Sequence, residues 1–450
     1  MFATPMRMGP SLVRGLLILA VHWGAGGCDR EAPTPGRPIT LVVSADTDGW
    51  ITPCGCTSNQ SGGMLRRASF LSRLADRQVI YLDAGGAAAG TSAYHKLKFE
   101  TVLRGERLMN VAAHNIGQSE AAFGADYLRE TSKRSGVPLI SANVRNTSGV
   151  LAVEPLRLVS AGRERLAIVG VLAPSLAVVG IRVDDPRRAV LAAIAPVKGK
   201  YDRLIVLAYL PQDQIEGLAA ALPEADAIIG GPTGQPIAPH RVGPTLVISA
   251  TNKGKFLARL DLDSSPASAW TSQIVEMDGK FPDDPQQVSV LHEYLARLGQ
   301  LDLDAAQSGA TAMPVGVPAD YRVAGNSACS SCHAPDSQLW LATNHSHAWQ
   351  TLKPNGFDAD PFCRKCHTTG YGLPGGFDSW GRTPTLVSVG CESCHGPSQT
   401  HVRDPRIRTT YTAADQCVRC HDHENSPHFE FAAYWEKIRH GKPMTHAAGE

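Results

Sequence analysis

The chain has 450 residues, of which 43% are hydrophobic and 19% charged, and its formal net charge is +1 at pH 7. This length suggests two or three domains, and these fractions argue for a buried core and against global disorder. The nearly neutral charge excludes a partner recruited by charge alone, so we expect no nucleic-acid partner.

Residues 1–28 have the pattern of a secretory signal peptide. Arg7 and Arg14 form a basic segment, and the apolar run that follows is shorter than the roughly 20 residues of a membrane span. Small residues then lead to Cys28, which resembles a bacterial lipoprotein signal with Cys28 as the lipidated residue. The alternative is simple cleavage of the signal. We expect a bacterial periplasmic or otherwise extracytoplasmic protein, anchored to the membrane as a lipoprotein.

After a short proline-containing tether at residues 29–38, the segment 39–300 alternates between short apolar runs and helical patterns. This pattern predicts a layered α/β domain, because strands buried between layers form continuous apolar runs. Helices are predicted at Met64–Leu74, Leu103–Ala113 and Gln287–Gln300. The predicted strands are Ile39–Asp46, Gln78–Gly85, Gly136–Val144, Leu166–Pro174, Asp202–Leu210, Asp226–Gly231 and Thr245–Thr251.

Residues 301–322 are small, polar and proline-containing, and we interpret them as a linker. The segment 323–450 is rich in His, Cys, Gly and Trp and poor in apolar runs, so side chains alone could hardly form its core. A covalently attached apolar cofactor would supply one. We therefore expect a second, mostly α-helical domain packed around a cofactor.

Four C-x-x-C-H motifs occur in this second segment. In this motif two thiols attach to one haem, and the next residue offers its imidazole to the iron. Zinc binding is the competing interpretation of paired cysteines, but a zinc site would not require a histidine after every pair. The sequence thus predicts four c-type haems. Their attachment cysteines are Cys329, Cys332, Cys363, Cys366, Cys391, Cys394, Cys417 and Cys420, and the proximal ligands are His333, His367, His395 and His421.

The second axial ligands should also be histidines. We select His401 and His440, together with one of His345 and His347. His440 ends a predicted helix that begins near Phe429. Four haems in so short a segment must lie close together, which is the arrangement of an electron-transfer chain.

The segment around these motifs resembles the tetrahaem cytochrome c-554 family. The resemblance rests on Cys363-x-x-Cys-His-Thr-Thr-Gly-Tyr-Gly, on Gly390-Cys-Glu-Ser-Cys-His-Gly-Pro-Ser, and on the tail around Tyr434-Trp and His440-Gly-Lys, and it covers about residues 327–442. It implies mostly bis-histidine haems, with one haem lacking a sixth ligand. In that family the open haem is the second one, which corresponds here to the haem of His367.

The first domain resembles the secreted 5'-nucleotidase metallophosphoesterases over about residues 40–263, which implies an αββα fold. The resemblance rests on Ser44-Ala-Asp46-Thr-Asp48-Gly, Leu82-Asp-Ala-Gly-Gly86, Gly117-Gln-Ser-Glu120 and Asp226-Ala-Ile-Ile-Gly-Gly231. In the family, Asp and His at strand ends hold two metal ions that activate water. Most of those positions are occupied here by other residues, namely Gly86, Gln118, Ser119, Tyr209, Pro232 and Gly234. We therefore expect a degenerate, inactive domain with no metal, in which Asp46, Asp48 and Asp83 cap loops or helix starts.

Cys54 and Cys56 lie just after the Asp46-Thr-Asp48 turn, at the mouth of the former catalytic cleft. They could form a local disulfide, act as a redox-active thiol pair, or supply ligands for a metal or cofactor together with Asp46 and Asp48. The sequence leaves these three interpretations open.

The sequence predicts a carrier that passes electrons between a donor and an acceptor protein, with the degenerate domain binding a partner or ligand. Three alternatives remain. The first is a multihaem oxidoreductase whose open haem acts on a small nitrogen or sulfur compound. The second is a metal-dependent phosphoesterase with a haem appendage, and the third is a structural subunit of a cytochrome complex.

Overall fold

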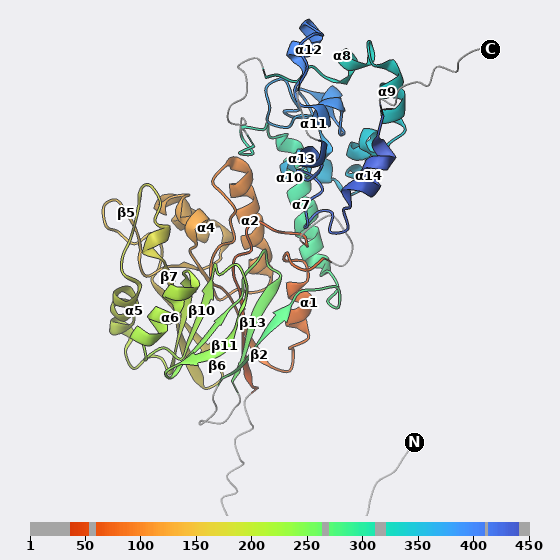
Figure 1. Ribbon diagram of the computed structural model, residues 1–450. Coiled ribbons are helices and arrows are strands. Elements are labelled where there is room, and N and C mark those ends of the chain that lie inside the picture. The colour runs from red at the N-terminus through yellow and green to blue at the C-terminus, as the bar shows by residue number, and fades with distance from the viewer. Residues whose placement is uncertain (1–36, 54–59, 263–269, 311–320, 410–412, 441–450) are drawn as a thin grey trace, which may run out of the picture. The chain divides into compact units, whose positions relative to one another are not determined.

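The computed structural model describes residues 37–53, 60–262, 270–310, 321–409 and 413–440 (Figure 1). The predicted signal peptide, Cys28, Cys54 and Cys56 lie outside these residues. Within the described residues, no helix combines the length and the hydropathy needed to cross a membrane.

Two six-stranded sheets form the first domain. The first has the order β14-β13-β1-β2-β3-β4, and the second has the order β11-β12-β10-β9-β7-β6. In chain order the strands are β1 (Ile39–Ser44), β2 (Gln78–Asp83), β3 (Ala113–Asn115), β4 (Leu139–Ile140), β5 (Val144–Asn146), β6 (Leu156–Ala161), β7 (Glu164–Leu172), β8 (Ile181–Val183), β9 (Arg203–Tyr209), β10 (Ala227–Gly231), β11 (Ile237–Val242), β12 (Thr245–Ser249), β13 (Phe256–Leu262) and β14 (Thr271–Glu276). Strands β5 and β8 form a separate pair.

Helices cover the outer faces of both sheets, as Figure 1 shows for α2, α5 and α6. The α-helices of this domain are α1 (Arg67–Ser72), α2 (Ala93–Leu108), α3 (Gln118–Ala121), α4 (Ala125–Ser135), α5 (Pro186–Ile194), α6 (Gln212–Ala221) and α7 (Pro285–Leu301), with 3-10 turns at η1 (Pro174–Leu176) and η2 (Ala195–Val197). The result is a four-layer αββα arrangement, which confirms the predicted fold class.

Alternation along the central strands explains the layers. Leu41 and Val43 of β1 point into the core between the sheets, where they pack with Ile205 and Ile229 of the second sheet. Val42, between them in sequence, faces the opposite side and joins the core beneath α2 and α7. Successive side chains of a strand point to opposite faces, so a continuous apolar run is needed where both faces are covered.

Several element boundaries differ from the predictions. The helix expected at Leu103–Ala113 is α2, which begins at Ala93 and ends at Leu108, and Ala113 already belongs to β3. The strand expected at Gly136–Val144 is divided between β4 and β5. Strands β6, β11, β13 and β14 were missed, because each pairs antiparallel at or near a sheet edge and lacks the continuous apolar run of a central strand.

The C-terminal segment consists of short helices joined by irregular chain. Its only core cluster among the described residues contains Val323, Trp349, Phe377 and Leu386. So small a core agrees with the expectation that a cofactor fills this region. The helices are α8 (Asn326–Ser330), α9 (Ala334–Leu341), α10 (Pro361–His367), α11 (Cys391–His395), α12 (Gln399–Arg403), α13 (Ala413–Cys417) and α14 (Phe431–Ile438), with 3-10 segments η3 (Asn344–Thr351), η4 (Lys353–Asn355), η5 (Phe357–Ala359) and η6 (Pro384–Leu386).

Candidate functional site

Each C-x-x-C-H motif begins within or at the end of a short helix. Helix α11 spans its whole motif from Cys391 to His395, and α10 ends at His367 of the second motif. Helical spacing places the first cysteine, the second cysteine and the histidine at positions i, i+3 and i+4, on one face of the turn. All eight of these cysteines have free thiols, as attachment to a haem requires.

Three pairs of imidazole rings face one another in this segment. The ring centres lie 6.3 Å apart for His333 and His401, and 5.8 Å apart for His395 and His440. The third pair joins His421 to His345 at 6.1 Å. Two imidazoles on opposite sides of one metal, each with a metal–nitrogen bond of about 2 Å, would have ring centres roughly 6 Å apart. The three pairs therefore fit two-sided coordination of an iron.

Hydrogen bonds at Nδ1 fix the orientation of several of these rings. The Nδ1 atom of His401 lies 2.9 Å from the carbonyl oxygen of Ile407, and that of His440 lies 2.9 Å from the carbonyl oxygen of Ile438. His421 Nδ1 lies 2.9 Å from the hydroxyl of Ser426. A partner at Nδ1 leaves Nε2 as the nitrogen that can bind a metal.

His367 differs from the other motif histidines. Its Nδ1 lies 2.7 Å from the carbonyl oxygen of Ala348, so this ring is oriented in the same way. Within the described C-terminal residues, however, no second imidazole ring packs against it. His347, the alternative to His345, is exposed.

Cysteines of different motifs lie next to one another. The thiol of Cys329 donates a hydrogen bond to Cys391, which raises the pKa of Cys329 and links the first motif to the third. In the same way the thiol of Cys366 donates to Cys420, which raises the pKa of Cys366 and links the second motif to the fourth. Cys394 of the third motif also lies near Cys417 and Cys420 of the fourth, so the motifs are adjacent in the order first, third, fourth and second.

Two buried carboxylates hold this region, and both were missed by sequence reasoning. Glu392, between the cysteines of the third motif, accepts hydrogen bonds from the backbone N–H groups of Ala324, Gly325 and Ser398 at 2.7–3.0 Å. Asp360, directly before α10, accepts bonds from two phenols and caps that helix. The signal for Asp360 was available, because an aspartate followed by proline is typical of a helix start.

The phenols that bind Asp360 come from the first domain. The hydroxyl of Tyr94 on α2 donates to Oδ1 at 2.6 Å, and that of Tyr294 on α7 donates to Oδ2 at 3.1 Å. Phe362 of α10 packs edge-to-face on Trp50, with ring centres 5.1 Å apart. These contacts fix the second haem motif against the αββα domain.

At the carboxyl end of β9, Tyr209 occupies the space beside Gly86. A Cβ atom at Gly86 would lie 2.5 Å from a ring carbon of Tyr209 and 2.9 Å from its hydroxyl oxygen. Tyr209 also lies 3.3 Å from Asp46, as donor to its Oδ1, and Thr251 donates to the other oxygen at 2.8 Å. Tyr209 thus fills the space into which a side chain at position 86 would extend.

We predict that Gly86→Asp destabilises the protein instead of rebuilding a metal site. The new side chain would collide with Tyr209 at a backbone angle φ of +82°, so a loss of about 2 kcal/mol or more is expected. Gly180→Asp is the matched control, since Gly180 has the same φ and no atom within 4 Å of its Cβ position. Guanidinium unfolding followed by circular dichroism measures the difference, and equal midpoints for both variants would refute the collision.

Asp48 carries a raised pKa. Burial penalises its charged form, and the neighbouring charge of Asp46 adds to the effect, so the pKa rises to about 6. The folded pKa exceeds the unfolded value near 4, so folding favours the protonated form. Stability should therefore fall as the pH rises from about 4 to about 6 and change little from this group above that range.

Asp48→Asn should remove this part of the pH dependence. At pH 7–8 the variant is expected to be more stable than the parent by up to about 2 kcal/mol, allowing for partial solvent screening. Asp213→Asn, an exposed aspartate on α6, is the control and should leave the profile unchanged. Unfolding midpoints between pH 4 and pH 8 test this, and parallel profiles for parent and Asp48→Asn would count against it.

Comparison with known proteins agrees with both parts of this description. Residues 328–396 match the family described as "Cytochrome c554 and c-prime". The C-terminal part resembles cytochrome c-554. A curated relative, cytochrome c-554 of Nitrosomonas europaea, is 37% identical over 103 residues, which cover 20% of this chain and 44% of the relative. The chain therefore spans less than half the length of that cytochrome.

The solved structures that match share the fold of the first domain. A 5'-nucleotidase precursor from Thermus thermophilus has a TM-score of 0.51 at 21% identity, covering 59% of this chain and 62% of that one. The sulfate thiohydrolase SoxB of the same organism has a TM-score of 0.52 at 18% identity, covering 61% and 62%. The phosphoesterase YfkN from Bacillus subtilis has a TM-score of 0.51 at 15% identity, covering 58% and 98%. At these identities the likeness establishes the fold alone.

Proposed function

We propose that this protein is an extracytoplasmic electron carrier with four covalently attached c-type haems. The observation that carries the proposal is the set of three facing histidine pairs, each joining a C-x-x-C-H histidine to a second histidine. When bound, haem c supplies an iron that takes up and releases one electron at a time. The chain contributes axial ligands, fixed ring orientations and a close arrangement of the four sites.

Three haems in this proposal are bis-histidine and one is open. His333 pairs with His401, His421 with His345, and His395 with His440. His367 provides the single protein ligand of the second haem, since no other imidazole packs against it within the described residues. The proximity of cysteines from different motifs supports a row of neighbouring haems, as electron transfer requires.

The αββα domain serves in this proposal as a docking or ligand-binding module for a redox donor or acceptor protein. The loss of the family's metal ligands and the position of Tyr209 argue against hydrolysis. The signal sequence with Cys28 supports delivery outside the cytoplasm and a lipid anchor.

A second candidate function is an oxidoreductase acting at the open haem. The observation that favours it is the single imidazole at His367, because an iron without a sixth ligand can bind a small nitrogen or sulfur compound. The αββα domain would then serve to dock the redox protein that exchanges electrons with the open haem.

Electron paramagnetic resonance of the oxidised holoprotein, with and without nitric oxide, hydroxylamine or nitrite, tests both functions. Mass spectrometry of the same sample should show four haems per chain, and a chain without covalent haem would refute the proposal. We expect three low-spin haems and one high-spin haem that responds to the added ligand. Four low-spin haems that do not respond would be consistent with the electron-carrier function and would rule out the oxidoreductase function.

A further inference from the structure

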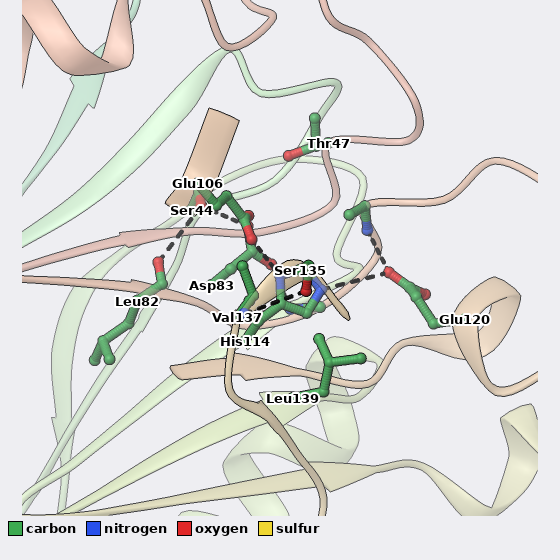
Figure 2. Close-up of polar contacts among 12 residues, drawn as sticks. Ser44, Thr47, Leu82, Asp83, Glu106, His114, Glu120, Ser135, Val137 and Leu139 are labelled. Atoms are coloured by element: carbon green, nitrogen blue, oxygen red, sulfur yellow. Dashed lines mark hydrogen bonds and ion pairs between the residues drawn. The ribbon is translucent and has the colours of Figure 1, made fainter. Parts of the chain in front are cut away.

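A buried polar cluster lies in the αββα domain. Figure 2 shows Asp83 at the end of β2, His114 in β3 and Glu106 from α2 converging on one point. One ligand atom from each lies within 4.8 Å of the others, and all three residues are fully buried. His114 was missed by sequence reasoning, because a single histidine in a short strand carries no spacing signal.

The contacts within the cluster leave several polar atoms without a partner. His114 Nδ1 lies 2.8 Å from Glu106 Oε2 and 3.8 Å from Asp83 Oδ1. On the other side, His114 Nε2 lies 3.9 Å from Glu120 Oε1, too far for a hydrogen bond. Glu106 Oε1, His114 Nε2 and Glu120 Oε2 are buried and have no hydrogen-bond partner. Buried polar atoms are rarely left unsatisfied, so these atoms indicate a ligand.

Asp83, Glu106 and Glu120 are three fully buried carboxyl groups, and the buried cation near them is Arg67. Arg67 donates to the hydroxyls of Tyr81 and Thr47 and does not contact the carboxylates directly. A divalent cation held by a neutral His114 would offset the charges of Asp83 and Glu106, which a buried site tolerates only when they are compensated.

We propose that Asp83, Glu106 and the Nδ1 atom of His114 bind one divalent transition-metal cation. One imidazole nitrogen and carboxylate oxygens form a ligand set suited to Zn²⁺ or Mn²⁺, and a charge of +2 neutralises the cluster. The Ser44 hydroxyl donates to Asp83 Oδ2, and the Gly85 N–H donates to Oδ1 at 2.8 Å, which orients this carboxylate.

This site differs from the two-metal centre of the related enzymes. Asp83 lies three residues before Gly86, and His114 lies four before Gln118, so the cluster uses other positions of the chain than the replaced ligand positions. The proposal departs from the expectation of a metal-free domain, which was drawn from the cleft positions. A metal here would tie α2 to β2 and β3, and its binding energy would contribute to folding.

The test is the metal content of the full-length holoprotein. Mass spectrometry measures the amounts of zinc and manganese, and the absorbance of the haems gives the amount of protein. After prolonged dialysis against EDTA we expect about one Zn²⁺ or Mn²⁺ per chain, because fully buried ligands exchange slowly. Glu106→Gln keeps the shape of the side chain but removes a ligand charge, and should lower the occupancy at least about tenfold. Glu100→Gln, on the same helix but outside the cluster, should retain the metal.

X-ray absorption at the zinc or manganese edge gives a second readout. We expect nitrogen and oxygen neighbours without sulfur, whereas sulfur neighbours would assign the metal to cysteines and overturn the proposal. The proposal also fails if protein produced with added Zn²⁺ and Mn²⁺ contains less than about a tenth of an ion per chain, since protons would then balance the cluster. Metal retained unchanged in Glu106→Gln would contradict it as well.

Discussion

His401→Ala is expected to convert one low-spin haem into a second high-spin, ligand-binding haem. His401 is the ring opposite His333 at 6.3 Å, and no other imidazole lies against His333 among the described residues. Removing it would leave the first haem with one protein ligand. Carbon monoxide uptake by the reduced protein should rise from about one to about two molecules per chain, because an iron that lacks a sixth ligand binds it.

His428→Ala is the matched control for this change. His428 is an exposed histidine of the same segment that takes part in none of the three ring pairs. It should leave both the resonance spectrum and carbon monoxide uptake as in the parent. A low-spin first haem in His401→Ala would mean that another group ligates it, and the proposed pairing would be wrong.

Asp360→Ala is expected to be among the most destabilising single substitutions in the C-terminal segment. The change would remove the carboxylate to which the buried hydroxyls of Tyr94 and Tyr294 donate, and it would remove the cap from α10. Unsatisfied buried donors and a lost cap together should cost about 3 kcal/mol or more. The measurement is the guanidinium unfolding midpoint of the holoprotein, followed by far-ultraviolet circular dichroism.

Asp358→Ala controls for a lost aspartate at nearly the same place in the chain. Asp358 lies two residues earlier, in η5, and neither tyrosine donates to its carboxylate. Its removal should shift the midpoint little. Equal shifts for the two variants would show that the contact of Asp360 with the tyrosines contributes little to stability.

The central strands and the haem motifs could be predicted because their signals are local. A strand such as β1 or β9, covered on both faces, must be a continuous apolar run, and the run is visible in the sequence. Edge strands such as β6 and β14 were missed because one face is exposed and the run is interrupted. The division of Gly136–Val144 into β4 and β5 depends on partners elsewhere in the chain.

The sequence by itself determined that this chain carries four C-x-x-C-H haem-attachment motifs. That conclusion follows from residue types at fixed short spacings. Only the tertiary structure decided that His345, and not His347, lies against His421, that Tyr209 fills the space beside Gly86, and that His114 meets Glu106 and Asp83. These contacts join residues distant in the chain, and their distances depend on how the layers pack, which no local pattern specifies.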